Sequence, residues 1–358
     1  MQYPAHGANP QTLYEQLHIP LPETLIDLSE NVNALGFPES FRTVWADLLQ
    51  QLPTYPHEQA EPLRSMLAVK HGITNQHIVI GNGAAELLMA LAQLYRQQKV
   101  VMIHPTFSEY ARTLHQHNAE IMDITVDDVA NYTLPMEKIR HAMQQAQAIY
   151  VCNPNNPTGV LLSKKELFAI IEYGQQVQCD VVIDEAFMDW TDERESCMEY
   201  VARFSHVTIL RSMTKMYSMA GVRLGYCVSQ KAHHLKAYLP HWNVSNIAIA
   251  LGVQALDERT FTEQSRLFAE EGRQLFSHFL QRYHCIVSDS VTNYVTFRFP
   301  QAQTASHFYQ AMLKQGIVLR HTYNFKGMNG EWLRVAIKEQ QKMTVFKKAF
   351  EHYVHQNH

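Results

Sequence analysis

The sequence lacks the patterns that mark disulfide-rich, metal-binding and membrane proteins. Its 20 histidines include no HExxH motif, and we expect no metal site. No apolar run approaches the length of a membrane span, and residues 1–10 have no signal-peptide pattern. The cysteines are widely spaced without a CxxC pair, which argues against disulfides and favours a reducing cytoplasm. These cysteines are Cys152, Cys179, Cys197, Cys227 and Cys285.

Runs of one charge sign are also missing. The chain has 30 Lys and Arg against 34 Asp and Glu, a formal net charge of −4, and no basic cluster. Nucleic acid and anionic membrane are therefore poor candidates as partners. What the chain does have is 358 residues, 46% of them hydrophobic, which exceeds the usual size of one core and predicts two domains.

Short apolar, β-branched runs alternate with amphipathic helical runs from residue 46 to residue 255. Continuous apolar strands separated by helices predict an α/β fold, in which a mainly parallel central sheet has helices on both faces. The strand-like runs are 77–83, 100–107, 148–155, 179–187, 207–212 and 223–229.

The two ends of the chain have a different texture. Residues 1–45 are rich in Pro and Asn, and they predict an irregular arm, with a short helix around Trp45, that packs on the smaller domain. Residues 256–358 begin with a long polar helix over 258–283. Shorter alternating strands and a final amphipathic helix follow, which predicts a smaller α+β domain.

Polar motifs follow the predicted strands of the larger domain. The carboxyl ends of parallel strands lie at one rim of a sheet, where ligands bind. A glycine turn that opens a helix presents free N–H groups and the positive end of the helix dipole, which suits a phosphate. The motifs are GNGA (81–84), Phe107, NPNNPTG (153–159), DEAF (184–187), SMTK (212–215) and GVRLG (221–225).

Two of these motifs have competing interpretations. GNGAAE resembles a dinucleotide fingerprint, but Glu86 stands where the third glycine is required. SMTK matches the Ser-x-x-Lys of penicillin-binding enzymes. However, the sequence has Ser288-Asp289-Ser290 in place of Ser-Asp-Asn and has no Lys-Thr-Gly. The ordered combination of motifs therefore carries the interpretation, and no single motif does.

NPNNPTG, DEAF, SxTK and GxRxG, in this order, resemble the signature of fold-type I pyridoxal-phosphate enzymes of the aminotransferase class. The resemblance covers nearly the whole chain and implies pyridoxal 5'-phosphate as the cofactor. It implies that Lys215 holds the cofactor as a Schiff base, that Asp184 faces the pyridine nitrogen, and that Asn156 donates to the ring phenolate.

The same resemblance implies the remaining contacts of the cofactor and of the substrate carboxylate. Phe107 stacks on the ring, and Phe187 replaces a tyrosine that is common in similar enzymes, which removes a hydroxyl. Tyr55 reaches the phosphate from a partner subunit, which implies a homodimer with shared active sites. Arg334 binds the substrate α-carboxylate. The cofactor phosphate is assigned to Gly83, Ala84, Ser212 and Arg223.

Within this class the N-terminus is similar to that of threonine-phosphate decarboxylases. HGAN (6–9) and IDLSENVNALG (26–36) match their elements, except that Ala8 replaces a glycine and Ala34 a proline. Lys338 also stands where arginine is common. The similarity implies that the substrate phosphate is bound by the arm and by one arginine of the small domain: His6, Asn31 and Arg320.

The expected reaction is decarboxylation of L-threonine O-3-phosphate, a small phosphorylated amino acid. Its product would resemble the aminopropanol phosphate used in cobalamin assembly. Histidinol-phosphate aminotransferases share the core motifs, so transamination stays the alternative, and a cofactor-binding sensor without catalytic activity is the third hypothesis.

Overall fold

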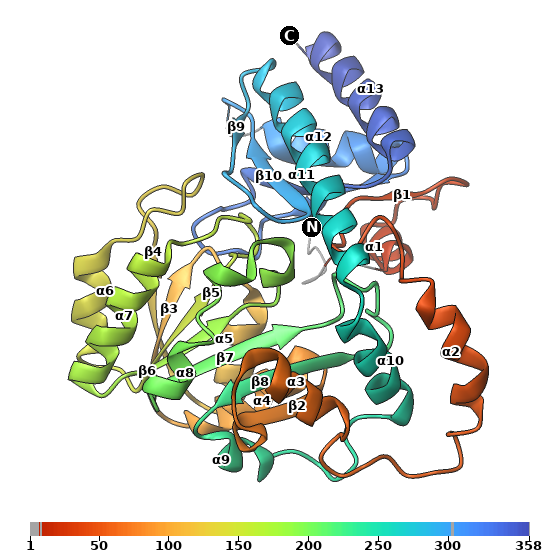
Figure 1. Ribbon diagram of the computed structural model, residues 1–358. Coiled ribbons are helices and arrows are strands. Elements are labelled where there is room, and N and C mark those ends of the chain that lie inside the picture. The colour runs from red at the N-terminus through yellow and green to blue at the C-terminus, as the bar shows by residue number, and fades with distance from the viewer. Residues whose placement is uncertain (1–6, 8, 302–303, 358) are drawn as a thin grey trace.

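A seven-stranded sheet forms the centre of the computed structural model, which describes residues 7, 9–301 and 304–357 (Figure 1). Strand β8 runs antiparallel to both of its neighbours, and the other pairs are parallel. The sheet is thus mixed but mainly parallel, as predicted. In spatial order its strands are β2 (Ile78–Asn82), β8 (Leu224–Ser229), β7 (Val207–Ser212), β6 (Asp180–Asp184), β5 (Ala148–Cys152), β3 (Lys99–His104) and β4 (Glu120–Thr125).

Both faces of this sheet are covered by helices, because alternate residues of each strand are buried on opposite sides. In β6, Val181 and Ile183 join one apolar cluster, whereas Val182 joins the other. This double burial explains why the strands are continuous apolar runs in the sequence. The helices that pack in the first cluster include α3 (Leu63–His71), α6 (Met136–Met143), α7 (Lys164–Val177), α8 (Tyr200–Arg203) and α10 (Asn246–Leu256). In the second cluster are α4 (Gly83–Leu94), α5 (Ser108–Gln116) and α9 (Ala232–Lys236).

The C-terminal part forms a smaller α+β unit, as predicted, around an antiparallel sheet. Its strands are β12 (Arg320–His321), β13 (Trp332–Ala336), β10 (Tyr294–Arg298) and β9 (Ile286–Val287). Three helices surround it: α11 (Arg259–Gln281), α12 (Thr304–Lys314) and α13 (Gln340–Asn357). Helix α11 leads from the larger unit into the smaller one (Figure 1). Phe297, Phe308 and Phe350 lie at the centre of the small core.

The N-terminal segment is more regular than predicted. Its elements are α1 (Pro10–Leu17), β1 (Ile26–Asp27), which pairs in parallel with β11 (Ile317–Val318), and α2 (Ser40–Leu49). Tyr14 of α1 is buried and donates to the carbonyl of Leu313 at 2.6 Å, so α1 packs on the small domain. Helix α2 packs on the large domain through Phe41 and Leu48. The domain limits 1–45, 46–255 and 256–358 stay predictions.

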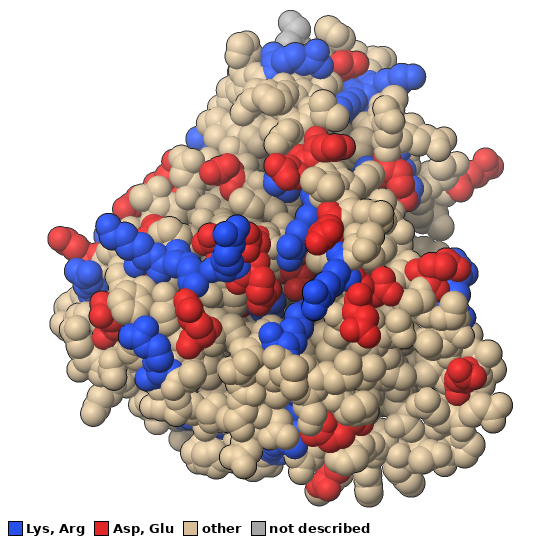
Figure 2. Space-filling view, in the orientation of Figure 1, with Lys and Arg blue, Asp and Glu red and all other residues tan. Residues whose placement is uncertain are grey.

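The described helices include none that is long and apolar enough to cross a membrane. Three 3-10 helices complete the secondary structure of the described residues: η1 (Asn75–His77), η2 (Met188–Trp190) and η3 (Glu193–Glu195). Figure 2 shows acidic and basic side chains interspersed on the face it draws, without a broad basic surface that would suit nucleic acid.

Candidate active site

The carboxyl ends of the central strands, the start of α4 and the small sheet enclose one pocket of about 250 Å³. Motifs from distant parts of the sequence therefore meet, as the parallel topology requires. The predicted site residues that line it are Asn31, Ala84, Phe107, Asn156, Asp184, Phe187, Ser212, Lys215, Arg223, Arg320 and Arg334.

Lys215 follows β7 and is partly exposed to the pocket. Its Nζ atom lies 3.3 Å from Oγ of Ser212. Burial lowers the pKa of Lys215, and the nearby cations Arg223 and Arg334 lower it further against the opposing effect of Asp184. An amine whose pKa is lowered has a larger neutral fraction, which is the nucleophilic form.

Asp184, at the end of β6, is a buried carboxylate that accepts two hydrogen bonds. Tyr110 of α5 donates its hydroxyl at 2.6 Å, and the amide of Ala186 donates at 2.9 Å. Burial raises the pKa of Asp184, while Tyr110, Ala186 and Lys215 lower it in part. Within the described residues no cationic side chain forms an ion pair with it, so the site suits a protonated ring nitrogen.

An anion cradle lies at the N-terminus of α4. The side chain of Asn82 does not cap the helix, which leaves the first amides available. Gly83 has φ +75°, and a Cβ there would lie 2.7 Å from Nη2 of Arg223, so the glycine lets the guanidinium approach the helix end. The hydroxyls of Ser212 and Thr214 lie 2.8 Å apart on the other side. This donor set fits a phosphate dianion.

Aromatic rings and an amide complete the part of the pocket expected to hold the cofactor ring. Phe107 lines the pocket and packs edge-on against Tyr110, with centroids 5.6 Å apart. Phe187 packs edge-on against Tyr294 at 5.1 Å. Asn156 accepts from Nη1 of Arg334 at 2.6 Å, which leaves its amide nitrogen to donate to a ligand. These residues fit pyridoxal 5'-phosphate.

Two arginines of the small domain face the same pocket. Arg320 and Arg334 are register partners on β12 and β13, and both are buried. Burial lowers the pKa of Arg334 to about 10. Burial, and then repulsion from Arg334, lowers the pKa of Arg320 to about 9. Two buried guanidinium groups that repel each other are stabilised by bound anions.

The surroundings of the two arginines differ. Arg334 donates to the carbonyl of Ser29 at 2.8 Å, and its Nε has no hydrogen-bond partner among the described residues. Arg320 donates to Oδ1 of Asn324 at 2.8 Å and lies over the ring of Phe325, 4.9 Å from its centroid. Arg334 thus lies beside Asn156 and the expected ring site, whereas Arg320 lies toward the 322–331 loop.

Of the described residues predicted in the arm and at the dimer contact, only one is seen in the pocket. Asn31 lines the pocket, and its Oδ1 has no hydrogen-bond partner within the described part of the chain. His6 lies outside the described residues. Tyr55 is 76% exposed, lies outside the pocket lining and packs on Trp242 with centroids 4.8 Å apart.

Sequence motifs missed several residues of the pocket. Tyr110 lies three positions after Phe107 in an ordinary amphipathic helix, so nothing in the sequence marks it. Thr214 lies within the SMTK motif, and its place two residues after Ser212 is the signal that groups the two hydroxyls. Glu30 and Phe325 also line the pocket. Glu30 lies within the 26–36 element without an assigned role, and Phe325 comes from a segment that carries no motif.

Comparison with known proteins gives concordant matches over most of the chain. A family model described as aminotransferase class I and II matches residues 23–350. The threonine-phosphate decarboxylase of Salmonella typhimurium is 28% identical, over 93% of this chain and 92% of that protein. The histidinol-phosphate aminotransferase structure from Clostridium acetobutylicum is 28% identical, covers 91% of this chain and 98% of its own, and has a TM-score of 0.85. The Sinorhizobium meliloti histidinol-phosphate aminotransferase in complex with pyridoxal-5'-phosphate, 19% identical, shares the fold with a TM-score of 0.88 over 98% of this chain and 96% of its own.

Proposed function

This chain belongs to the aminotransferase class I and II family of pyridoxal-phosphate-dependent enzymes, and we propose that it removes CO₂ from L-threonine O-3-phosphate. The pairing of buried Arg320 with buried Arg334 carries the proposal. A substrate with two anionic groups can neutralise both, and this amino acid has a carboxylate and a phosphate. The threonine-phosphate decarboxylase among the relatives supports this choice.

Bound pyridoxal 5'-phosphate supplies an electron sink for the bond that breaks at the substrate Cα. The residues of the chain bind it and control protons around it. The amine of Lys215, with its lowered pKa, serves as the nucleophile that attaches it and as the group that moves a proton near Cα. Asp184 would keep a proton on the ring nitrogen, and Arg223 with the amides of Gly83 and Ala84 would hold the cofactor phosphate.

The orientation of the substrate decides which Cα bond breaks. Arg334 is fixed by Asn156 and Ser29, so a carboxylate bound to its guanidinium takes one direction relative to the ring. One orientation of the substrate would favour loss of the carboxylate as CO₂, and the other would favour loss of the Cα hydrogen, which leads to transamination. We infer that the arm and Arg320 impose the first orientation by holding the substrate phosphate.

The proposed phosphate end of the substrate lies between the arm and the small domain. Arg320 supplies the guanidinium, oriented by Asn324 and by the face of Phe325. Asn31 supplies a buried side-chain amide in the same pocket. His6 is proposed as a third contact on the resemblance alone, because it lies outside the described residues.

Transamination of a histidinol-phosphate-type substrate is the second candidate. It is favoured by the aminotransferase structure from Clostridium acetobutylicum, which is as similar in sequence as the Salmonella typhimurium decarboxylase. Lys215, Asp184 and Asn156 serve both reactions. Such a substrate also carries a phosphate, but its main chain has no carboxylate for Arg334.

We also propose that the enzyme is a homodimer with shared active sites and that it works in the cytoplasm. The exposed ring of Tyr55 supports the first proposal, since the resemblance assigns this residue to a partner's cofactor phosphate. All five cysteines are buried and unpaired, which supports a reducing compartment.

The deciding experiment measures CO₂ release from O-phospho-L-threonine by the cofactor-loaded protein. Release that is lost in Lys215→Ala is the expected result. Transfer of an amino group from histidinol phosphate to a 2-oxo acid, without CO₂ release, would establish the second candidate. Cofactor binding with neither activity would identify a non-catalytic sensor.

A further inference from the structure

A buried ion pair joins the ends of β6 and β7 on the side away from the pocket. Glu185 directly follows Asp184, and Arg211 directly precedes Ser212. Nε of Arg211 donates to Oε2 of Glu185 at 2.8 Å, and the two side chains are only 3% and 0% exposed. The DEAF and SMTK motifs explain the neighbours of both residues, but neither member of the pair has a role in the proposed chemistry.

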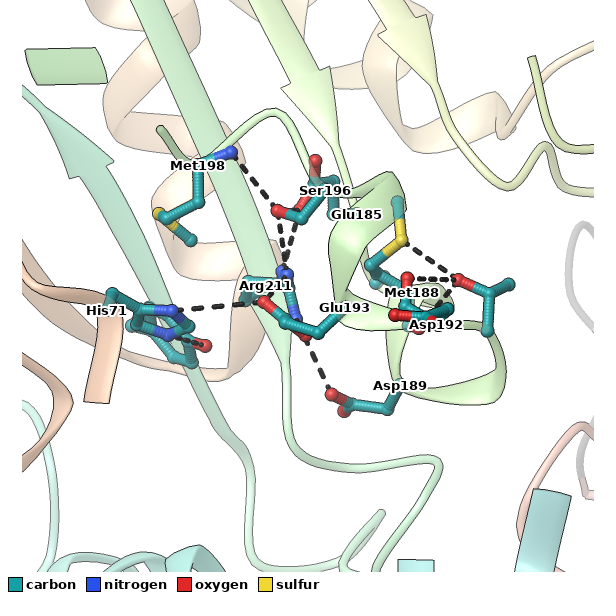
Figure 3. Close-up of polar contacts among 12 residues, drawn as sticks. His71, Glu185, Met188, Asp189, Asp192, Glu193, Ser196, Met198 and Arg211 are labelled. Atoms are coloured by element: carbon teal, nitrogen blue, oxygen red, sulfur yellow. Dashed lines mark hydrogen bonds and ion pairs between the residues drawn. The ribbon is translucent and has the colours of Figure 1, made fainter. Parts of the chain in front are cut away.

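The pair is the centre of a larger network (Figure 3). Nη2 of Arg211 donates to Glu193 at 2.6 Å and to the hydroxyl of Ser196 at 3.0 Å. The carboxylate of Glu185 accepts from that hydroxyl and from the amide of Cys197, both at 2.7 Å. The network therefore ties the two strand ends to the 186–197 segment, which begins with Ala186 and Phe187 at the pocket wall.

Strand geometry places this network directly behind the cofactor residues. Successive side chains of a strand point to opposite faces, so Asp184 and Ser212 face the pocket while Glu185 and Arg211 face away. The amide of Glu185 donates to the carbonyl of Leu210 at 2.8 Å, which fixes the register of the two strand ends. A shift of the ion pair would therefore move Asp184 relative to Ser212.

Stability alone is a poor reason for such a pair. The free energy needed to desolvate two buried charges offsets much of their attraction. A protein with an apolar pair of equal volume in their place is often as stable or more stable. The ion pair also fixes an orientation, because the rigid fork of five donors on a guanidinium restricts how its partners can be arranged. Arg211 uses this fork to hold Glu185 and Glu193 at the same time.

We propose that Glu185 and Arg211 are positioning residues of the cofactor site, which fix Asp184, Phe187 and Ser212 relative to one another. They act through strand register and through the 186–197 segment, without touching the cofactor. This inference rests on cofactor binding and not on the choice between decarboxylation and transamination. It therefore survives if the proposed substrate is wrong.

The other end of β6 offers a matched control. Asp180 is also a buried carboxylate in an ion pair, with both oxygens 2.6 Å from Nζ of Lys231 and one of them 3.1 Å from the hydroxyl of Tyr95. It lies at the opposite end of the strand from the pocket. Glu185→Gln and Asp180→Asn thus remove the same kind of group from one strand, but only the first change lies behind the site.

The test titrates the apoprotein of each variant with pyridoxal 5'-phosphate and measures the thermal midpoint of the apoprotein separately. Both variants should lower the midpoint. Only Glu185→Gln should weaken cofactor binding, by roughly tenfold to a hundredfold. Unchanged cofactor affinity in Glu185→Gln, or an equal loss in Asp180→Asn, would overturn the proposal, because the ion pair would then serve only folding.

Arg211→Lys is the second variant, and it tests the same proposal if the Glu185→Gln protein does not fold. Lysine retains the charge but cannot hold Glu185 and Glu193 with a rigid fork. The expected result is a folded protein with weaker cofactor affinity than the Asp180→Asn protein. Cofactor affinity equal to that of the unmodified protein would show that fork geometry is irrelevant and would contradict the proposal.

Discussion

Tyr110 donates a hydrogen bond to Asp184, the buried carboxylate that we propose faces the cofactor ring. Its hydroxyl donates to Oδ2 of Asp184 at 2.6 Å, and this hydrogen bond lowers the pKa of the carboxyl against the raising effect of burial. Ring binding needs the ionised carboxylate, so it is retained above this pKa and lost as the pH falls through it.

Tyr110→Phe should therefore raise the pKa of Asp184 and move the acid limit of cofactor binding to higher pH. The measurement is cofactor affinity as a function of pH, and affinity at neutral pH should fall by roughly tenfold. Tyr150→Phe is the control, since the hydroxyl of Tyr150 is buried nearby and has no partner within the described structure. An acid limit that moves equally in both variants would contradict this role of Tyr110.

Arg320 should distinguish phosphorylated from unphosphorylated substrates. Arg320→Ala removes a buried guanidinium from the pocket, and binding of O-phospho-L-threonine should weaken on the order of a hundredfold. Binding of L-threonine should change little, because Arg334 still holds the carboxylate. Arg298→Ala removes a half-exposed arginine from the same sheet as a control. Equal losses for both ligands would show that Arg320 does not bind the phosphate.

At the scale of elements, two glycine substitutions separate backbone strain from phosphate binding at the start of α4. Gly83→Ala places a Cβ 2.7 Å from Nη2 of Arg223, at a residue with φ +75°. Gly72→Ala introduces the same backbone strain, with φ +63°, but no atom lies within 4 Å of the added Cβ. Each change should lower the free energy of unfolding by about 1–2 kcal/mol.

Only Gly83→Ala should weaken binding of pyridoxal 5'-phosphate, because the methyl group displaces the guanidinium of Arg223 from the helix end. Denaturant unfolding of the apoprotein measures the shared strain, and cofactor titration measures the specific effect. If the two variants bind the cofactor equally well, the cradle does not depend on close approach of Arg223 to Gly83.

The strands were predictable where burial on both faces makes a sequence continuously apolar, as in 148–155, which contains β5. Strand β4 escaped prediction because it is an edge strand, and Glu120 and Asp123 interrupt its apolar pattern. Helix α1 escaped because its polar composition resembles a loop, although Pro10 suits a first helical turn and Tyr14 anchors the helix to the small domain. Local pattern does not encode such tertiary anchoring.

The candidate site also contains residues that the sequence predicts and residues that it does not. Asn156, Asp184 and Lys215 were predictable because each lies in a short motif after a strand, where topology alone brings them together. Tyr110 and the Glu185–Arg211 pair were not, because their roles depend on which side chains lie behind or beside a motif in space. Tyr110 lies in an ordinary amphipathic helix, and the motifs that contain Glu185 or follow Arg211 do not indicate that these two side chains pair.

The whole molecule presents aromatic surface that a single chain does not cover. Tyr55 and Trp242 are 76% and 52% exposed and pack on each other, and Trp45 of α2 is 53% exposed. Trp242 also adopts the left-handed region with φ 55°, which is uncommon for a bulky side chain. A second copy of the chain is the proposed cover, with Tyr55 reaching the partner's cofactor phosphate.

Mixed dimers test whether the partner subunit supplies Tyr55. Lys215→Ala alone should be inactive, and Tyr55→Ala alone should bind the cofactor weakly. When the two variants are unfolded together and refolded as a mixture, each hybrid dimer contains one site with an intact Lys215 and a Tyr55 from the other chain, so activity should reappear. The unmodified chain paired with Lys215→Ala is the control for refolding yield. A mixture no more active than its parents, from a preparation that sedimentation shows to be dimeric, would place Tyr55 in the site of its own chain or outside catalysis altogether.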